Sequence, residues 1–346
     1  MANNFKNILI IKPSALGDII QVLPALAALR KTFSDANITW LIRPEFAPLL
    51  KSHPHLTDTI LFDRKFLGQA WFNPRAFAAL ISFIKLLRKR RFDAVFDFQG
   101  LFRTAAFACL SGSKKRFGMA KARELAHIFY TDRIKPDSEG IHLVDHFLKM
   151  TKAAGVSETQ AGFVLPCDPR DVDSVNSILT SHSVDPTNYA VLVPGSAHED
   201  KQWPVERFAE LAEKISSRFN LSIIASGVDS EKDTVHRLET LANVPIVNLA
   251  GLTNIGQLIA LLKAAKVVVS NDTGPGHIAA ALGTPIVMMF GRTNPGRVAP
   301  YGRKNAVAAI EPYARGTDIN SADPKHDMKA VTVEHVFEKV CHQIET

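Results

Sequence analysis

The feature that most constrains the fold is a regular alternation of short, β-branched apolar runs with amphipathic helical stretches. In the first half of the chain, strands are predicted over residues 8–12, 38–42 and 92–98, and helices over 18–32 and 75–90. This alternation is typical of a parallel sheet covered by helices. It predicts an α/β fold.

A second alternating set begins near residue 189, so the chain is predicted to contain two tandem, doubly wound, Rossmann-like domains. A chain of 346 residues is long enough for two separate cores. The segment 166–173 breaks the rhythm and is interpreted as an inter-domain connection. In this second set we predict strands over 189–195, 221–226, 245–250, 266–272 and 285–291, and helices over 205–218, 230–242, 254–264 and 275–282.

The predicted domains are residues 1–175 and 176–325, followed by a segment, 326–346, with a helix from about Thr332. We expect this last helix to pack back toward the first domain. Ligands of doubly wound folds bind beyond the carboxyl ends of the strands. The functional motifs should therefore follow strands directly.

The composition restricts the partners without choosing one. A net charge of +7 favours anionic partners, which leaves nucleic acid, phosphorylated metabolites and anionic lipid headgroups open. No nucleic-acid-binding motif appears, and no nucleic acid partner is expected. The three cysteines form no CxxC, the histidines form no HExxH, and Asp171-Val-Asp173 falls in the presumed connection. We therefore expect no metal and no cofactor.

The amino-terminal sequence lacks the layout of a signal peptide, because the apolar run 8–11 is short and leads into a charged loop. No segment approaches the ~20 apolar residues that span a bilayer. The expected location is the cytoplasm.

The first motif, Lys12-Pro-Ser-Ala-Leu-Gly-Asp18, directly follows the first predicted strand. Its single glycine does not fit the GxGxxG loop of dinucleotide-binding domains. Asp18 falls in the first turn of a helix, where a carboxylate complements the helix dipole. It can equally act as a general base toward an acceptor hydroxyl. Both interpretations stay open.

The second motif is Pro194-Gly-Ser-Ala-His-Glu-Asp-Lys-Gln-Trp-Pro204. Gly195 and Ser196 allow backbone amides to face a ligand, and Lys201 adds a positive charge. Together they can hold a diphosphate without metal. The alternative is a polar loop with a solvated lysine.

The third motif, Ser270-Asn-Asp-Thr-Gly-Pro-Gly-His277, opens a helix after a predicted strand. Gly274 and Gly276 leave backbone amides unobstructed, Thr273 adds a hydroxyl, and His277 lies one turn into the helix. A helix amino terminus favours an anion. This motif predicts an anion site.

Two further segments each have two interpretations. Ser226-Gly-Val-Asp-Ser-Glu231 follows a strand, and its acidic side chains can accept hydrogen bonds from a ribose or cap the next helix. Residues 75–91 combine apolar residues with Arg88, Lys89, Arg90 and Arg91. That helix is either a solvated face over a core or a contact with an anionic membrane surface.

These motifs, in this order, resemble the heptosyltransferase family of inverting glycosyltransferases (glycosyltransferase family 9), with two Rossmann-like domains of the GT-B type facing a central cleft. The resemblance rests on KPSALGDIIQVLPAL, PGSAHEDKQWP and VVVSNDTGPGHIAAALGTPIVMMFGRTNP. Two further stretches, 92–100 and 116–130, look like the first heptosyltransferase of the inner core, which adds heptose to Kdo on lipid A. The first domain would then bind the acceptor and the second the nucleotide sugar.

The resemblance also implies roles for individual residues. Asp18 would be the catalytic base and would face the acceptor, and Lys201 would stabilise the leaving diphosphate. Asp272 would contact the heptose, and Glu231 the ribose. The other implied donor contacts are Ser196, Ala197, Leu252 (at the adenine), Thr273, Gly274 and His277, and the other implied acceptor contacts are Arg64, Lys65 and Arg123.

The predicted function is therefore transfer of heptose from ADP-heptose to Kdo-lipid A with inversion and without metal, at the cytoplasmic face of the membrane. Ala197 stands where the family often has a hydroxyl, and the stretch after Pro300 matches weakly. The alternatives are a second heptosyltransferase, another nucleotide-sugar transferase of the family, and a nucleotide-sugar-binding protein without catalysis.

Overall fold

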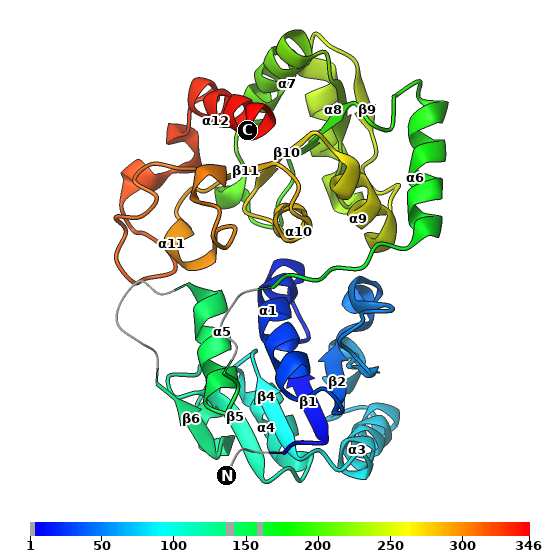
Figure 1. The fold of residues 1–346 in the computed structure, drawn as a ribbon, viewed down its shortest axis with the longest axis vertical. Coiled ribbons are helices and arrows are strands. Elements are labelled where there is room, and N and C mark those ends of the chain that lie inside the picture. Colours follow the sequence, from blue (N-terminus) through cyan, green and yellow to red (C-terminus); the bar gives the residue numbers. More distant parts are fainter. Residues whose placement is uncertain (1–3, 136–141, 158–161) are drawn as a thin grey trace. The chain divides into compact units, whose positions relative to one another are not determined.

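A computed structural model describes residues 4–135, 142–157 and 162–346. The chain divides into two compact units: unit 1 comprises residues 1–138 and 143–166, and unit 2 comprises 139–142 and 167–346. Each unit contains its own six-stranded sheet (Figure 1). The predicted α/β class with two doubly wound domains is confirmed.

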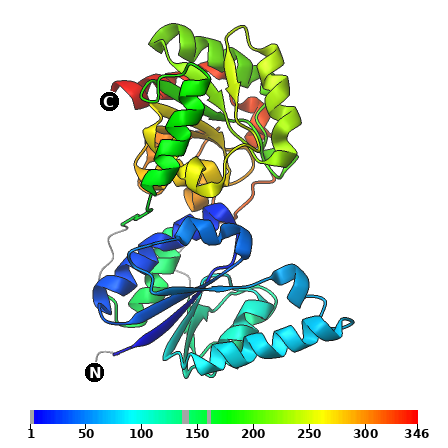
Figure 2. The ribbon, with the colours of Figure 1, turned by 90° about the vertical axis from the view of Figure 1, so that its right-hand side faces the viewer.

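In unit 1 the strands lie in the order β3-β2-β1-β4-β5-β6, and every neighbouring pair is parallel. Helices α1 and α5 pack together on one face, and α3 and α4 lie on the other (Figure 2). The strands are β1 (Asn7–Ile11), β2 (Asn37–Ile42), β3 (Asp58–Leu61), β4 (Ala94–Asp97), β5 (Lys115–Met119) and β6 (Asp132–Ile134), and the helices are α1 (Leu16–Thr32), α2 (Arg64–Leu67), α3 (Pro74–Lys89), α4 (Phe102–Leu110) and α5 (Leu143–Lys152).

Unit 2 has the same plan, with the order β12-β11-β10-β7-β8-β9 and parallel pairing throughout. Helix α7 packs with α8 and α12, and α9 packs with α6 and α10. The strands are β7 (Tyr189–Val193), β8 (Ser222–Ala225), β9 (Ile246–Asn248), β10 (Val267–Asn271), β11 (Ile286–Met289) and β12 (Val307–Ala308), and the helices are α6 (Pro169–Ser181), α7 (Val205–Phe219), α8 (Lys232–Leu241), α9 (Ile255–Ala264), α10 (Gly274–Leu282), α11 (Pro295–Val298) and α12 (Val333–Glu345).

Both sheets have the same switch point, where the strand order reverses. In unit 1 it lies between β1 and β4, and in unit 2 between β7 and β10. All five residues of β7 and all five of β10 are buried, as expected for strands covered on both faces. The loops that leave these central strands at their carboxyl ends are the positions where doubly wound folds bind ligands.

Four strands escaped the sequence prediction: β3, β5, β6 and β12. They are two to five residues long and lie toward or at the edges of the sheets. In β5 only Phe117 and Gly118 are buried, so its apolar signal is weak. Only its centre contributes to the core.

The segment predicted as a connection is mostly helical. Asp168 caps the amino terminus of α6 by accepting a hydrogen bond from the Arg170 amide, and Pro169 occupies the first turn. The contact-based division falls between Pro166 and Cys167, whereas the predicted boundary at residue 175 lies inside α6. The prolines and aspartates that suggested a linker lie at the start of this helix.

The carboxyl-terminal helix belongs to unit 2. Thr332 caps α12, where the sequence predicted its start. Its buried residues Val333, Val336 and Val340 belong to the core of unit 2, together with residues of α7 and β11. The apolar face of this helix thus packs against the second sheet, and the expectation that the helix also packs toward the first domain stays a prediction.

Candidate active-site groups in each unit

The centre of the candidate site in unit 2 is an ion pair across the switch point. Lys201 follows β7, Asp272 follows β10, and Lys201 Nζ lies 2.6 Å from Asp272 Oδ2. The two strands are neighbours in the sheet. The topology therefore brings together two motifs that lie 71 residues apart in the chain.

Asp272 is a buried carboxylate that stays charged. Burial by itself would raise its pKa, but the hydrogen bond with His277 and the charge of Lys201 outweigh burial and lower the pKa to about 2. His277 Nε2 lies 3.6 Å from Asp272 Oδ1, so the two carboxylate oxygens face two different side chains. The group presents a fixed negative charge beside a lysine that is partly accessible to a ligand.

Asn271 holds the two motifs together, a role that was not predicted from the sequence. Its side-chain amide donates to the Pro194 carbonyl at 2.8 Å, and its side-chain oxygen accepts from the Trp203 amide at 3.0 Å. The residue is fully buried. It fixes both ends of the loop that carries Lys201, and its place between Ser270 and Asp272 in the third motif was the signal that could have revealed it.

Glu231 is placed against the first loop of unit 2. Its carboxylate lies over Gly195, where an added Cβ would come within 2.2 Å of it. Burial raises the pKa of Glu231, and its Oε2 accepts from the Val228 amide. Gly195 therefore allows a carboxylate from the next strand's loop to reach the anion-binding motif.

The remaining predicted donor residues lie on the same edge of the sheet. Ser196 is buried and its hydroxyl accepts from the His198 amide, whereas Ala197 is exposed. Thr273 is the amino-terminal cap residue of α10, which begins at Gly274. Leu252 is exposed on the loop after β9, beside Gly251, whose amide donates to the Gly227 carbonyl. The loops after β7, β8, β9 and β10 thus carry all of these residues.

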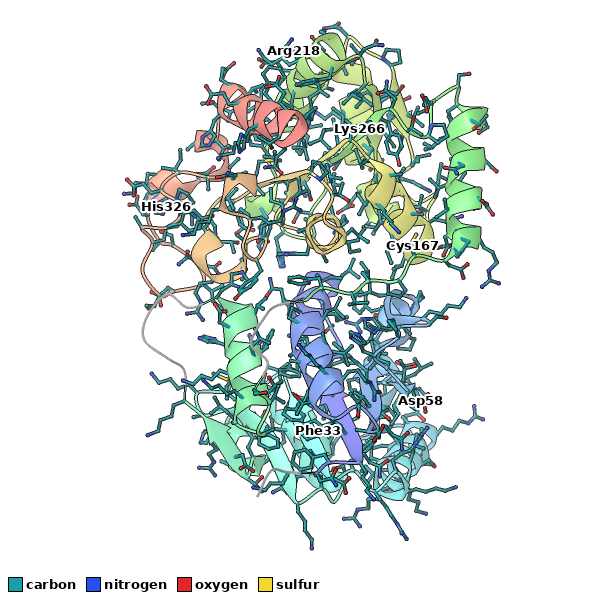
Figure 3. All side chains as sticks on the ribbon, in the orientation of Figure 1. Phe33, Asp58, Cys167, Arg218, Lys266 and His326 are labelled. Carbon is teal, nitrogen blue, oxygen red and sulfur yellow. The ribbon has the colours of Figure 1, made fainter. Side chains whose placement is uncertain are left out.

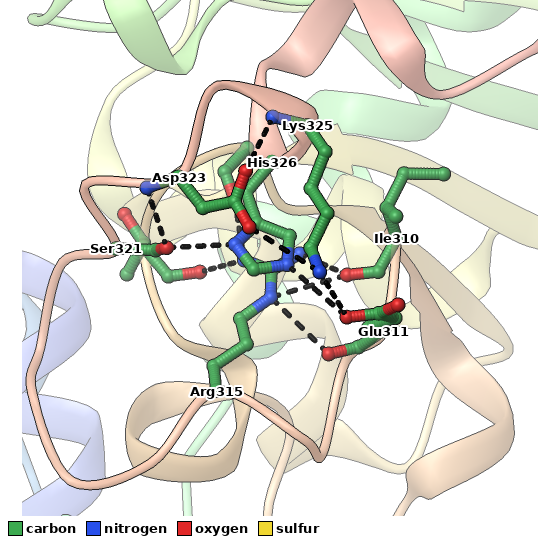
Figure 4. A network of polar contacts seen from close by, with 9 residues as sticks. Ile310, Glu311, Arg315, Ser321, Asp323, Lys325 and His326 are labelled. Atoms are coloured by element: carbon green, nitrogen blue, oxygen red, sulfur yellow. Dashed lines mark hydrogen bonds and ion pairs between the residues drawn. The ribbon is translucent and has the colours of Figure 1, made fainter.

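Arg315 stabilises the loop after β11, behind this edge of the sheet. Its guanidinium donates to the carbonyls of Gly291 and Thr293 in the loop after β11, and to that of Ile310 (Figure 4). The loop lies close to the Lys201 segment, since a Cβ at Gly291 would lie 3.4 Å from the Asp200 carbonyl oxygen. Arg315 therefore holds a loop on which the Lys201 segment rests.

In unit 1 the candidate base is paired with a buried lysine. Asp18 lies in the first turn of α1, and its Oδ2 is 3.0 Å from Lys12 Nζ. The Lys12 side chain is 6% exposed and the Asp18 side chain 47%. The pair orients a carboxylate whose other side is open to a ligand, and this role of Lys12 was not predicted from the sequence.

A cavity of about 220 Å³ lies at the switch point of unit 1 and is lined with cations. Arg64, predicted for the acceptor, lines it, as do Arg43 and Arg103, which were not predicted. Gln99 Oε1 is also buried there and has no hydrogen-bond partner in the part of the chain that the structure describes. Three arginines and an unsatisfied amide oxygen suit a ligand with carboxylate or phosphate groups and hydroxyls.

Asp97 supports the wall of this cavity. It ends β4, is fully buried, and accepts hydrogen bonds from the Tyr130 hydroxyl at 2.7 Å and the Thr104 hydroxyl at 2.9 Å. It also accepts from the Gln99 and Gly100 amides. Burial raises the pKa of Asp97 in spite of these bonds. The Tyr130 ring packs on Gly118, so the segments 92–100 and 116–130 act as one structure.

Two predicted acceptor residues do not line the cavity. Lys65 is exposed beside Arg64 at the start of α2, and Arg123 is exposed beside the lining residue Glu124. Both are neighbours of lining residues. The structure therefore brings together Arg64 and the Asp18 loop, and leaves Lys65 and Arg123 at its rim.

Within the described ranges 4–135, 142–157 and 162–346, no group of three or more His, Cys, Asp or Glu residues could hold a metal ion. None of the helices among these residues is long and apolar enough to cross a bilayer. The three cysteines are free.

Comparison with known proteins identifies the family. The sequence profile of glycosyltransferase family 9 (heptosyltransferase) matches residues 80–325. The chain belongs to this family. Among curated members of family 9 it is 30% identical over 305 residues to lipopolysaccharide heptosyltransferase 1 of Pseudomonas aeruginosa, covering 86% of this chain and 81% of the relative. It is 29% identical over 318 residues to the Escherichia coli K12 protein of the same name, covering 91% and 96%.

A solved family 9 structure matches as well. The E. coli heptosyltransferase WaaC with ADP superimposes with a TM-score of 0.77 and 26% identity, covering 97% of this chain and 99% of that one. The chain is therefore a glycosyltransferase of the GT-B type. The expected family and enzyme class are confirmed.

Proposed function

We propose that this family 9 enzyme transfers heptose from ADP-heptose to the Kdo residue of a lipid A acceptor, with inversion and with Asp18 as the general base. The observation that carries the proposal is the Lys201–Asp272 ion pair at the switch point of unit 2. The curated relatives that support it are named lipopolysaccharide heptosyltransferase 1, and the similar solved structure contains ADP.

On the donor side, the diphosphate binds the loops after β7 and β10. Lys201 and the backbone amides at the start of α10 meet its negative charge, which grows on the departing ADP in the transition state. Asp272 holds Lys201 in position and accepts hydrogen bonds from sugar hydroxyls. Glu231 accepts from the ribose, and the exposed Leu252 packs against the adenine. Ser196, Ala197, Thr273, Gly274 and His277 surround the phosphates.

On the acceptor side, the arginine-lined cavity binds the carboxylate of Kdo or a lipid A phosphate. Arg64 lies in the cavity, and Lys65 and Arg123 extend the positive charge from its rim. Asp18 accepts the proton of the attacking hydroxyl. The oxygen forms a bond to the anomeric carbon, the bond from that carbon to the phosphate oxygen breaks, and ADP leaves with the electron pair. A single displacement inverts the anomeric configuration.

We place the reaction in the cytoplasm, at the face of the membrane where a lipid-borne acceptor would be reached. The free cysteines at positions 109, 167 and 341 fit a reducing compartment.

The test is a transfer assay with ADP-heptose and heptose-free Kdo-lipid A, in which ADP release and the mass of the lipid product are followed. The wild type should add one heptose. Asp18→Asn should add none while binding ADP normally, and Asp35→Asn, which changes an exposed carboxylate beyond the other end of α1, should behave as the wild type. Near-full activity of Asp18→Asn would overturn the assignment of the base. Transfer only to an acceptor that already carries heptose would overturn the assignment of the acceptor.

A further inference from the structure

Unit 1 exposes a group of large apolar side chains between residues 66 and 81. Trp71 is 97% exposed, Phe72 78% and Phe77 55%. Phe66 and Ile81 are also exposed. Single exposed apolar residues are common, but several aromatic residues within one short segment mark an interaction site. We call these five residues the Trp71 surface.

Helix α3 continues the Trp71 surface with a mixed apolar and cationic face. Phe77, Ile81, Lys85 and Arg88 follow one another at intervals of three or four residues, so they lie on one side of the helix. All four are exposed. This side is therefore an amphipathic stripe that faces away from the sheet.

The exposed aromatic residues are not needed for the packing of α3. The helix uses a different side for the core, where Ala76, Phe83 and Leu87 are buried. Phe83 contacts Phe62 and Phe107, with ring centroids 6.0 and 5.1 Å apart. The far end is anchored by Arg90, which pairs with Asp58 at 2.5 Å (Asp58 is labelled in Figure 3). The Trp71 surface is thus an addition to a helix that is already fixed.

Cations surround the Trp71 surface. They form no ion pair with any side chain in the described ranges, in contrast to Arg90. All are exposed, and their charge has the sign of the whole chain's excess of +7. They are Arg64, Lys65, Arg75, Lys85 and Lys89.

We infer that the Trp71 surface and the cations around it dock unit 1 onto an anionic lipid bilayer. Amphipathic aromatic rings favour the level of the lipid headgroups, and clustered Lys and Arg are attracted to anionic lipid. The surface also adjoins the acceptor cavity, which Phe62 and Arg64 line. The inference rests on the proposed function only in this last respect, that a lipid-borne acceptor would be presented at the same place.

The chain carries its own probe for this contact. It has three tryptophans, and Trp40 and Trp203 are buried, so Trp71 alone is open to solvent. The full chain is mixed with vesicles of phosphatidylglycerol and phosphatidylethanolamine, or of phosphatidylcholine alone. With anionic vesicles the emission should shift to the blue and iodide quenching should fall. Trp71→Phe should still sediment with the vesicles but lose both signals.

Two double variants separate the apolar from the cationic contribution. Lys85→Gln with Lys89→Gln should lower the partition coefficient by roughly fivefold for each charge removed. Trp71→Ser with Phe72→Ser should lower it by more than about tenfold. Leu241→Ser, which changes an exposed leucine of unit 2, is the matched control and should bind as the wild type.

Unchanged vesicle binding in both double variants would overturn the inference. Equal binding of the wild type to anionic vesicles and to phosphatidylcholine vesicles would overturn it as well. A dimer that forms without vesicles and is lost in Trp71→Ser with Phe72→Ser would assign the surface to a second copy of the chain instead. None of the vesicles contains acceptor, so these results do not depend on catalysis. Transfer of heptose to a deacylated, water-soluble Kdo acceptor should be unchanged in the variants. If the wild type fails to transfer heptose to this acceptor, the result counts against the proposed function alone.

Discussion

Lys12, buried in unit 1, lies 3.0 Å from the half-exposed carboxylate of Asp18 and 6.0 Å from the centre of the Phe147 ring. The lysine has little access to solvent, so its role is to place the carboxylate. Lys12→Met should lower kcat roughly 100-fold, because the proposed general base, Asp18, would be out of position and lose most of its effect. ADP affinity, measured by calorimetry, should stay within twofold. Lys6→Met is the matched control, and an unchanged kcat in Lys12→Met would remove Lys12 from the mechanism.

Lys201 and Asp272 should behave as one unit in a double-mutant cycle. Lys201→Ala should weaken ADP binding and transfer, because a charge that meets the diphosphate is lost. Asp272→Asn should also impair transfer, since it releases Lys201. The free-energy loss in the double variant should be smaller than the sum of the losses in the two single variants, with a coupling energy of about 1–3 kcal/mol. The measurements are ADP titration and kcat/KM, and strict additivity would show that the ion pair has no functional role.

Gly195 should not tolerate a side chain. A Cβ there would lie 2.2 Å from the Glu231 carboxyl carbon, so Gly195→Ala must displace that carboxylate. We expect ADP affinity to fall at least about tenfold, the equivalent of one charge-assisted hydrogen bond. Gly162→Ala is the control, because nothing lies within 4 Å of a Cβ at that position. Equal ADP affinity of Gly195→Ala and Gly162→Ala would show that Glu231 does not contribute to nucleotide binding.

Arg315 should matter for stability and for the donor, although it lies outside the predicted motifs. Arg315→Met removes the donors to the carbonyls of Gly291, Thr293 and Ile310, and should destabilise unit 2 by about 2 kcal/mol. The KM for the donor should rise more than kcat falls, since the loop against the Lys201 segment loosens. Lys266→Met, which also removes one positive charge, should change neither quantity. A loss of stability without any change in KM would limit Arg315 to a structural role.

His53 should make unit 1 sensitive to mild acid. Its Nε2 donates to the Val164 carbonyl at 2.8 Å, and burial lowers its pKa from 6.5 to about 4. Between these values the unfolded chain binds a proton that the folded chain does not. The stabilisation is therefore complete above about pH 6.5 and is lost as the pH falls toward 4, by about 3 kcal/mol.

Urea titrations near neutral pH and near pH 4.5 measure this effect through the unfolding midpoint. His53→Gln should flatten the dependence on pH, and His182→Gln, which changes an exposed histidine of unit 2, should keep it. An equal dependence in the wild type and His53→Gln would assign the acid sensitivity to other groups.

The sequence predicted the central strands and most of the helices because their signals are local. The runs around β1, β7 and β10 are continuously apolar, and Thr332 or Asn254 mark helix starts through their capping chemistry. The short strands β5 and β6 carry few apolar residues and are held by their neighbours in the sheet. Such strands depend on contacts that are distant in the chain, so a local pattern does not reveal them.

The same distinction holds for the site. Motif order and position after strands predicted Asp18, Lys201 and Asp272. A residue that acts by bridging distant segments outside the motifs, such as Arg315, has no local signature. Arg43 was missed for a similar reason, because it enters the arginine-lined cavity of unit 1 from the end of β2.

The position of α12 in the core of unit 2 has a consequence for synthesis of the protein. The core of unit 1 is complete once residues up to 166 have left the ribosome, and domains commonly fold in the order in which they emerge. The core of unit 2 includes Val336 and Val340, so the part of the sheet that α12 covers, at β10, β11 and β12, is completed only at the end of translation. Nascent chains should therefore carry a folded unit 1 while unit 2 is still incomplete and open to chaperone binding.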